Sequence, residues 1–230
     1  MASRQVSVHC NQCTMREEHF TALSEAEIND IDQHRTELVY KKGESLCKQG
    51  AFISNLIFIR SGLVKLFVEN NNETSILFLK DGGSFIGLPS LYGDEVHHYS
   101  AEALSETKVC HINFAVIKKI LTENCIFGTD IIKIINKDMI IAFDRISSFS
   151  NKQLHGRFAE LLLYLHSEIY KSNPFRLTLT KTDLAKILST SKESVSRVFS
   201  TLKKDKIIKE SNHKIHIMKL AKLKRISQTG

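Results

Sequence analysis

Apolar residues between positions 37 and 114 of this 230-residue chain come in short runs that are rich in β-branched and aromatic side chains. Turn residues separate the runs, including Gly43, Gly50, Gly62 and the pair Gly82-Gly83. Short strands with frequent turns are typical of antiparallel sheets that close into a roll or barrel. The pattern therefore predicts a β-roll. Its clearest strands are Leu56–Ile59, Leu63–Val68, Ser75–Leu79 and Val109–Phe114.

After the roll, apolar residues recur at alternating spacings of three and four, which is the heptad pattern of a long helix. These residues are Ile132, Ile135, Met139, Ala142, Ile146 and Phe149. The helix either packs on the roll as a core helix or pairs with the same helix of a second chain. A polar stretch at 147–152 predicts a domain boundary, and the apolar spacing at 154–169 predicts a further helix.

The segment from Thr180 to Lys204 predicts two short helices joined by a tight turn. Thr180 and Asp183 are spaced as the N-cap and third residue of a helix, and Ser191 can cap the second helix. Short strands are expected at 176–179 and within 207–217. Together these elements predict a helix-turn-helix with a β-hairpin wing.

The second of these helices, 192–204, has one apolar and one polar face. Val195, Phe199 and Leu202 are spaced to pack inward. Arg, Glu and Ser side chains on the opposite face suit hydrogen bonding to bases and phosphates in a DNA major groove. The candidate DNA-binding residues are Lys192, Glu193, Ser196, Arg197 and Ser200. The alternative is a solvated helix in an unrelated helical protein.

The charge is divided unevenly along the chain. Residues 151–230 hold 17 Lys and Arg against 6 Asp and Glu, a net charge of +11, and the first 150 residues hold 15 against 19, a net charge of −4. A basic module is suited to phosphate contacts. We expect three parts: a sensor roll with an N-terminal cysteine arm at 1–127, a dimerisation helix at 128–150 and a DNA-binding domain at 151–230.

Composition narrows the remaining classes of protein. The first residues lack an apolar signal core, and no apolar run approaches the length of a membrane helix, so we expect a cytoplasmic protein with no membrane partner. In that reducing compartment the five cysteines do not predict a disulfide framework. The chain has no phosphate-binding glycine loop, nucleophile elbow or paired carboxylates, and no enzyme is predicted.

The order of elements and several motifs resemble the Crp/Fnr family of transcription regulators. The matching motifs are Lys42-Gly43-Glu44, Gln49-Gly50, Arg60-Ser61-Gly62 and Glu193-Ser194-Val195-Ser196-Arg197. The resemblance implies an α+β fold, with an antiparallel roll like a cyclic-nucleotide-binding domain, a long dimerisation helix and a C-terminal winged helix-turn-helix. It also implies a homodimer that binds palindromic double-stranded DNA and contacts RNA polymerase.

In this family, the Glu-x-x-Ser-Arg arrangement is similar to that of members that read TTGA-type half-sites. The resemblance assigns base reading to Glu193, Ser196 and Arg197. The turn Ser189-Thr190-Ser191 departs from the family because it lacks the glycine often present there. Cyclic AMP is not expected as a ligand, since Leu88 and approximately His97-His98 stand where the family's pocket has a glutamate and an Arg-Ser pair.

The cysteines resemble those of the Fnr-like branch, whose members hold an oxygen-labile [4Fe-4S] cluster. Cys10 and Cys13 match the N-terminal pair, and Cys110 matches the central ligand. His19 stands where the branch has its third N-terminal cysteine, and it can ligate iron through a neutral imidazole. Cys47 and Cys125 are reserve candidates. The resemblance thus implies sensing of oxygen or redox state through iron bound by Cys10, Cys13, His19 and Cys110.

The sequence is also compatible with other kinds of sensor site. Three cysteines and one histidine are also an ordinary structural zinc site. His97, His98 and His111 keep haem as a further alternative, and a thiol-based sensor is another. A regulator that recognises a small metabolite, with no cluster, is the competing function.

Overall fold

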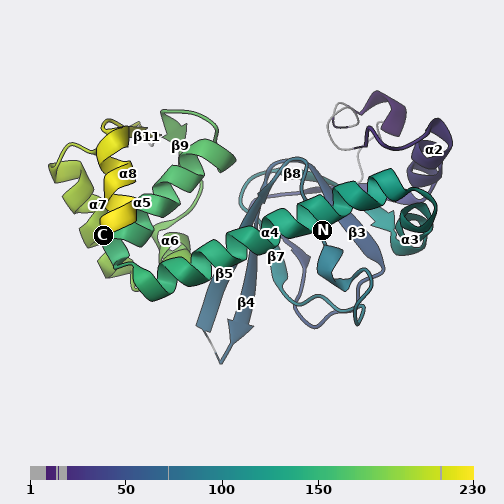
Figure 1. Ribbon diagram of the computed structural model, residues 1–230, viewed down its shortest axis with the longest axis horizontal. Helices are drawn as coiled ribbons and strands as arrows, with labels where there is room; N and C mark the ends of the chain where they lie inside the picture. Colours follow the sequence, from purple (N-terminus) through teal and green to yellow (C-terminus); the bar gives the residue numbers. More distant parts are fainter. Residues whose placement is uncertain (1–8, 14, 16–19, 72, 213) are drawn as a thin grey trace. The chain divides into compact units, whose positions relative to one another are not determined.

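The computed structural model describes residues 9–13, 15, 20–71, 73–212 and 214–230. The chain forms two compact units, one comprising Met1–Glu73 with Leu77–Ile140 and the other Thr74–Ile76 with Ile141–Gly230. The first unit is built mainly of strands and the second mainly of helices (Figure 1).

Two sheets with antiparallel pairing form the first unit, in the strand orders β1-β8-β3-β6 and β2-β7-β4-β5. The predicted roll is therefore confirmed. Apolar side chains between the sheets, such as Ile57, Ile59 and Val64, are almost completely buried. The strands are β1 (Arg35–Tyr40), β2 (Ser45–Cys47), β3 (Asn55–Ser61), β4 (Leu63–Asn70), β5 (Glu73–Asp81), β6 (Phe85–Ile86), β7 (Ser100–Ala103) and β8 (Thr107–Asn113).

The turn between β3 and β4 requires a glycine. Gly62 has a φ of +106°, and a Cβ at this position would lie 2.5 Å from Oγ1 of Thr107. The positive φ and the close approach together exclude any larger residue. Gly62 of the Arg60-Ser61-Gly62 motif therefore fixes the turn at which the chain passes from β3 in the first sheet to β4 in the second.

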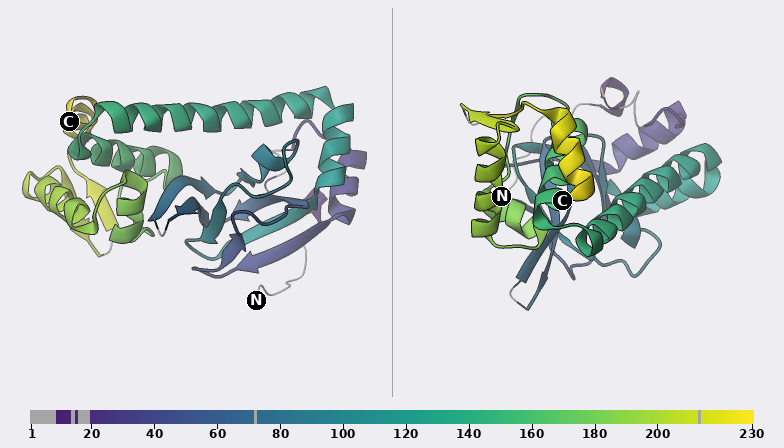
Figure 2. Two further views of the ribbon diagram at one scale, coloured as in Figure 1. Left: turned by 90° about the horizontal axis from the view of Figure 1, so that it is seen from below. Right: turned by 60° about the vertical axis from the view of Figure 1, so that its left-hand side comes forward.

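Short helices cover one end of the roll. They are η1 (Cys10–Gln12), α2 (Glu25–Gln33) and α3 (Phe114–Glu123), and a further short turn of helix, η2 (Leu88–Ser90), follows β6. The sequence pattern did not predict α2 or α3. A capping box between Ser24 and Glu27 starts α2, and Ile28 and Ile31 bury its inner face in the core. The helices α2 and α3 lie side by side at this end (Figures 1 and 2).

The long helix α4 (Cys125–Asn151) has 27 residues. Phe127 and Ile131 are buried in the roll's core, and Ile135 packs against that core. Ile135 thus belongs to the face that covers the roll. Other apolar side chains of α4 are exposed, namely those of Ile126, Ile132, Met139, Ile140, Phe143, Ile146 and Phe149.

The polar stretch 147–152 contains the end of α4, one residue beyond the end of the helix expected at 128–150. α4 continues to Asn151, because the stretch contains no proline or glycine. The next helix, α5 (Leu154–Tyr164), begins after two residues and is extended by a π-helical turn, η3 (Leu165–Ile169).

The second unit is a winged helix-turn-helix, as predicted. Its three-stranded sheet has the order β10-β11-β9. Phe158 of α5 and Phe199 of α7 pack edge to face in its core, with ring centroids 6.1 Å apart. The remaining elements are β9 (Phe175–Arg176), α6 (Lys181–Leu188), α7 (Lys192–Lys204), β10 (Ile208–Ser211), β11 (Lys214–Ile217) and α8 (Leu220–Thr229). The sequence pattern did not predict α8.

Candidate functional site

Hydrogen bonds at the two N-caps set the helix-turn-helix. Oγ1 of Thr180 accepts the backbone N–H of Asp183 at 3.0 Å, and the Asp183 carboxylate accepts the backbone N–H of Thr180 at 2.9 Å. Oγ of Ser191 accepts the backbone N–H of Ser194 at 3.1 Å. Both predicted caps are present, so local sequence alone defines where α6 and α7 begin.

Ser189 takes the place of glycine in the turn between these helices. Its backbone has φ +48° and ψ +58°, the left-handed conformation that closes α6. Serine adopts this conformation at a cost that glycine avoids. The chain thus keeps the turn geometry without the glycine.

The two faces of α7 differ in burial as the sequence predicted. The buried residues are Val195, Val198, Phe199 and Leu202. Lys192, Glu193, Arg197 and Ser200 are exposed, and Ser196 is partly exposed. Nη2 of Arg197 donates to Oγ of Ser194 at 3.2 Å, on the outer surface of the helix. A face of charged and hydroxyl side chains is therefore available to an external ligand.

Electrostatics of the second unit favour an anionic partner. Its excess of Lys and Arg includes the exposed Lys209 and Lys214 on the β10–β11 wing, which the sequence reasoning did not single out. A backbone hydrogen bond at the start of α7 lowers the pKa of Glu193, so this residue is ionised at neutral pH and can accept hydrogen bonds.

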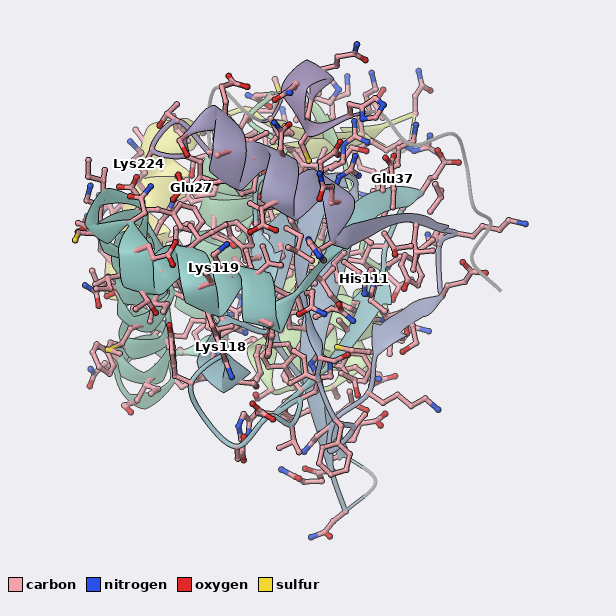
Figure 3. The ribbon with its side chains drawn as sticks, turned by 90° about the vertical axis from the view of Figure 1, so that its right-hand side faces the viewer. Glu27, Glu37, His111, Lys118, Lys119 and Lys224 are labelled. Atoms are coloured by element: carbon pink, nitrogen blue, oxygen red, sulfur yellow. The ribbon has the colours of Figure 1, made fainter. Side chains whose placement is uncertain are left out.

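A second candidate site lies in the first unit, where three cysteines line one cavity of about 30 Å³. Cys10 and Cys13 come from η1 and the residue that follows it, and Cys110 comes from β8. The other lining residues are Phe20, Ile28, Ile31, Arg35, Phe58 and Ile112. Sequence reasoning assigned the three cysteines to one site, and in the fold they line the same cavity. Figure 3 faces this end of the roll, with Glu27 on α2 and Lys119 on α3.

Charged side chains adjoin this cavity. The side chain of Arg35 is 4% exposed, and its Nη1 donates to Sγ of Cys110 at 3.4 Å. Its Nε and Nη2 donate to Oδ1 of Asp32 at 2.9 and 2.7 Å. The same Asp32 oxygen accepts the backbone N–H of Cys10 at 3.0 Å. Glu37 lies between Arg35 and Arg60, at 3.6 and 2.6 Å. Of these four charged residues, the sequence reasoning named only Arg60, as part of the Arg60-Ser61-Gly62 motif, and it placed none of them beside the cysteines.

The thiols of Cys10 and Cys110 are protonated at neutral pH. Burial raises the pKa of Cys10 to about 12. Burial also raises the pKa of Cys110, although Arg35 and Arg60 act in the opposite direction. For Asp32, burial acts to raise the pKa, but hydrogen bonds from His9, Arg35 and Cys10 outweigh it and hold the pKa well below its usual range. Metal binding at these cysteines therefore has to release protons.

The other candidate ligands are placed differently. His19 lies outside the described residues. Cys47 is partly buried against the core between the sheets, where burial raises its pKa to about 12, and Cys125 is exposed at the start of α4. Neither lines the cavity. Within the described ranges, no three His, Cys, Asp or Glu side chains are close enough together to hold a metal ion.

The histidines considered for haem lie elsewhere in the roll. His111 alternates with Cys110 along β8, and its Nε2 is 3.2 Å from the hydroxyl of Tyr40. His97 is buried, and its Nδ1 finds no partner among the described residues. His98 is exposed and pairs with Asp94. Figure 3 shows His111 below Glu37, on neighbouring strands.

The segment expected at the cyclic-nucleotide phosphate position is apolar. Leu88 is 6% exposed and belongs to the core beside α2 and α3. The backbone N–H of Gly87 donates to the hydroxyl of Tyr99 at 3.0 Å. The core side chain of Leu88 thus stands where a cyclic-nucleotide pocket would have a glutamate carboxylate.

Comparisons with known proteins agree with both units. Residues 37–124 match the family described as the cyclic nucleotide-binding domain, and residues 156–226 match the Crp-like helix-turn-helix domain. The chain therefore belongs to the Crp/Fnr family of transcription regulators, which are not enzymes. No helix in the described part of the chain is long and apolar enough to cross a membrane.

Relatives with related names cover most of the chain. The fumarate and nitrate reduction regulatory protein of Vibrio cholerae is 25% identical over 96% of this chain and 91% of its own length. The transcriptional activator protein Anr of Pseudomonas protegens is 26% identical over 77% and 75%. In fold, FixK2 from Bradyrhizobium japonicum is similar with a TM-score of 0.78, at 19% identity over 85% of this chain and 98% of its own.

Proposed function

We propose that this Crp/Fnr-family protein is an oxygen- or redox-responsive regulator that binds palindromic DNA as a homodimer and receives its signal through an iron–sulfur cluster. The observation that carries the proposal is the cavity that Cys10 and Cys13 of the N-terminal arm line together with Cys110 of β8. The names of two relatives, the fumarate and nitrate reduction regulatory protein of Vibrio cholerae and an anaerobic regulatory protein of Pasteurella multocida, support the same signal.

The donor set fits a soft metal. Thiolates are the usual ligands of iron–sulfur clusters, and a histidine can complete the set. Cys10, Cys13 and Cys110 would hold the cluster, with His19 as the fourth ligand. The cluster would supply oxygen-labile metal–thiolate bonds between the arm and the roll.

DNA binding would use the outer face of α7. Arg197 suits bidentate binding to guanine, Glu193 can accept a hydrogen bond from cytosine, and Ser196 can contact either strand. Lys192 and Ser200 would contact phosphates. The expected half-site is of the TTGA type, and RNA polymerase is the expected partner on the promoter.

Dimerisation would use the exposed apolar face of α4. Ile132, Met139 and Ile146 of the predicted seam lie on this face, and Phe143 and Ile140 add to it. Ile135 instead packs against the roll, and Ala142 is only partly exposed. An apolar stripe of this length is stabilised by pairing with a second copy of the helix.

The test is the visible spectrum and metal content of protein purified without oxygen. We expect broad visible absorption that bleaches in air, and we expect Cys110→Ser to abolish it. Cys125→Ser is the matched control, because this cysteine is exposed and does not line the cavity. Anaerobic DNA binding should weaken in step with the loss of absorption.

Other outcomes would overturn the cluster. A sharp Soret band would identify haem, and a colourless protein with one zinc per chain would identify a structural zinc site. If Cys110→Ser keeps wild-type iron content and oxygen-dependent DNA binding, a metabolite ligand becomes the better account.

A further inference from the structure

Asp32, in the last turn of α2, is a contact point for the N-terminal arm. Its Oδ1 accepts the backbone N–H of Cys10 at 3.0 Å, and its Oδ2 lies 2.8 Å from Nδ1 of His9. The two contacts involve consecutive residues of the arm and both carboxylate oxygens. The arm is therefore held by its main chain and one exposed side chain, immediately before the Cys-x-x-Cys pair.

The same carboxylate also orients Arg35. Two guanidinium nitrogens donate to Oδ1 of Asp32, and a third faces Cys110 at 3.4 Å and Glu37 at 3.6 Å. A guanidinium held by several hydrogen bonds in a buried position has little freedom to rotate. The Asp32–Arg35 pair thus contacts both chain segments that carry the cavity's thiols.

We propose that Asp32 and Arg35 form a dock for the cysteine arm, in which Asp32 fixes the backbone at Cys10 and Arg35 directs an N–H group at the sulfur of Cys110. The dock holds Cys10 at the cavity that Cys110, 100 residues later in the sequence, also lines. Both are positioning residues. Their effect on metal retention rests on the proposed function, whereas the docking of the arm does not.

The sequence of α2 provides a control for the dock. Asp30 is on the same helix two residues earlier, and it pairs with His34 and Lys119, both largely exposed. Asp30→Asn removes the same charge from the same helix without touching the arm. His9→Ala removes one contact of the dock at a side chain that is 75% exposed, so the fold is preserved.

The experiment is hydrogen–deuterium exchange of the full-length, metal-free protein, followed by mass spectrometry of the peptide that contains residues 9–13. We expect Asp32→Asn to accelerate exchange in this peptide about tenfold, His9→Ala to accelerate it by less, and Asp30→Asn to leave it unchanged. Exchange in β8 reports whether the roll of each variant is intact. If β8 is disturbed in Asp32→Asn, His9→Ala decides the result.

The second measurement uses protein reconstituted with iron and sulfide. We expect the visible absorption of Asp32→Asn and Arg35→Lys to be lost to a chelator several-fold faster than that of wild type or Asp30→Asn. Equal exchange of residues 9–13 in wild type and in both dock variants, Asp32→Asn and His9→Ala, would overturn the dock. Faster exchange with unchanged cluster lifetime would overturn its positioning role. A wild type that takes up no cluster refutes the proposed function, and the exchange result still decides whether the arm is docked.

Discussion

His111 and Cys110 are neighbours on β8 that face opposite sides of the strand. Cys110 lies with the core beneath α2, whereas His111 contacts Tyr40 near His97. Burial, with a further contribution from His97, lowers the pKa of His111 from 6.5 to about 4. The folded chain therefore holds His111 neutral at a pH where the unfolded chain would protonate it.

Acid should weaken the roll through this residue. Because the folded-state pKa is below the unfolded value, the stabilisation is complete above pH 6.5 and is lost as the pH falls from there toward 4. At about pH 5 the loss should approach about 2 kcal/mol. We expect His111→Gln to lose correspondingly less stability between about pH 7.5 and about pH 5, as measured by urea unfolding followed by circular dichroism. Parallel pH profiles for the two proteins would contradict this.

Arg197 is expected to read one base pair. Replacing it with Ala should cost about 1 to 3 kcal/mol on the specific site and relax selectivity at one position. Lys192→Ala is the control, because loss of a phosphate contact should weaken specific and random DNA equally. Fluorescence anisotropy with both DNAs at fixed salt measures the difference. If Arg197→Ala loses the same affinity for specific and random DNA, Arg197 does not read a base.

At the scale of elements, the turn between α6 and α7 contains a strained residue. Ser189 has a left-handed backbone, which glycine adopts without steric cost. We expect Ser189→Gly to stabilise the protein by about 0.5 to 1 kcal/mol. Thr190→Gly, at the next position and without a positive φ, should destabilise it. Thermal unfolding of both variants checks this, and a lower melting temperature for Ser189→Gly would refute it.

Local signals explain which elements the sequence could predict. The caps at Thr180 and Ser191 involve residues three apart, and the strands of the roll have compact apolar runs, so short windows identify them. By contrast, α2 presents only Ile28 and Ile31 to the core, and α3 follows directly on the apolar run of β8. Neither gives a long periodic pattern.

The thiol cavity could be predicted only in part. Motif resemblance paired the cysteines, but Arg35 and Cys110 are 75 residues apart, and their contact depends on the antiparallel pairing of β1 with β8. The heptad spacing also assigned Ile135 to the dimer seam, because spacing alone does not show which side of α4 the roll covers.

At the scale of the whole molecule, two chains are expected to pair along α4. Ile146→Asp would place two like charges in the apolar interface and should weaken dimerisation at least about tenfold. Lys137→Asp is the control, since Lys137 is exposed and is not part of the apolar face. Analytical ultracentrifugation should find monomers of Ile146→Asp and dimers of the control. An unchanged dimer would show that another surface joins the chains.

The exposed apolar face of α4 also makes gene control depend on how much protein the cell contains. If only paired chains bind a full site, then at low abundance the amount of active species rises with the square of the chain concentration, about fourfold for each doubling. If loss of the cluster also weakened pairing, abundance and oxygen would act on the same monomer–dimer equilibrium, and a cell could adjust the oxygen threshold of its target genes by making more or less of this protein.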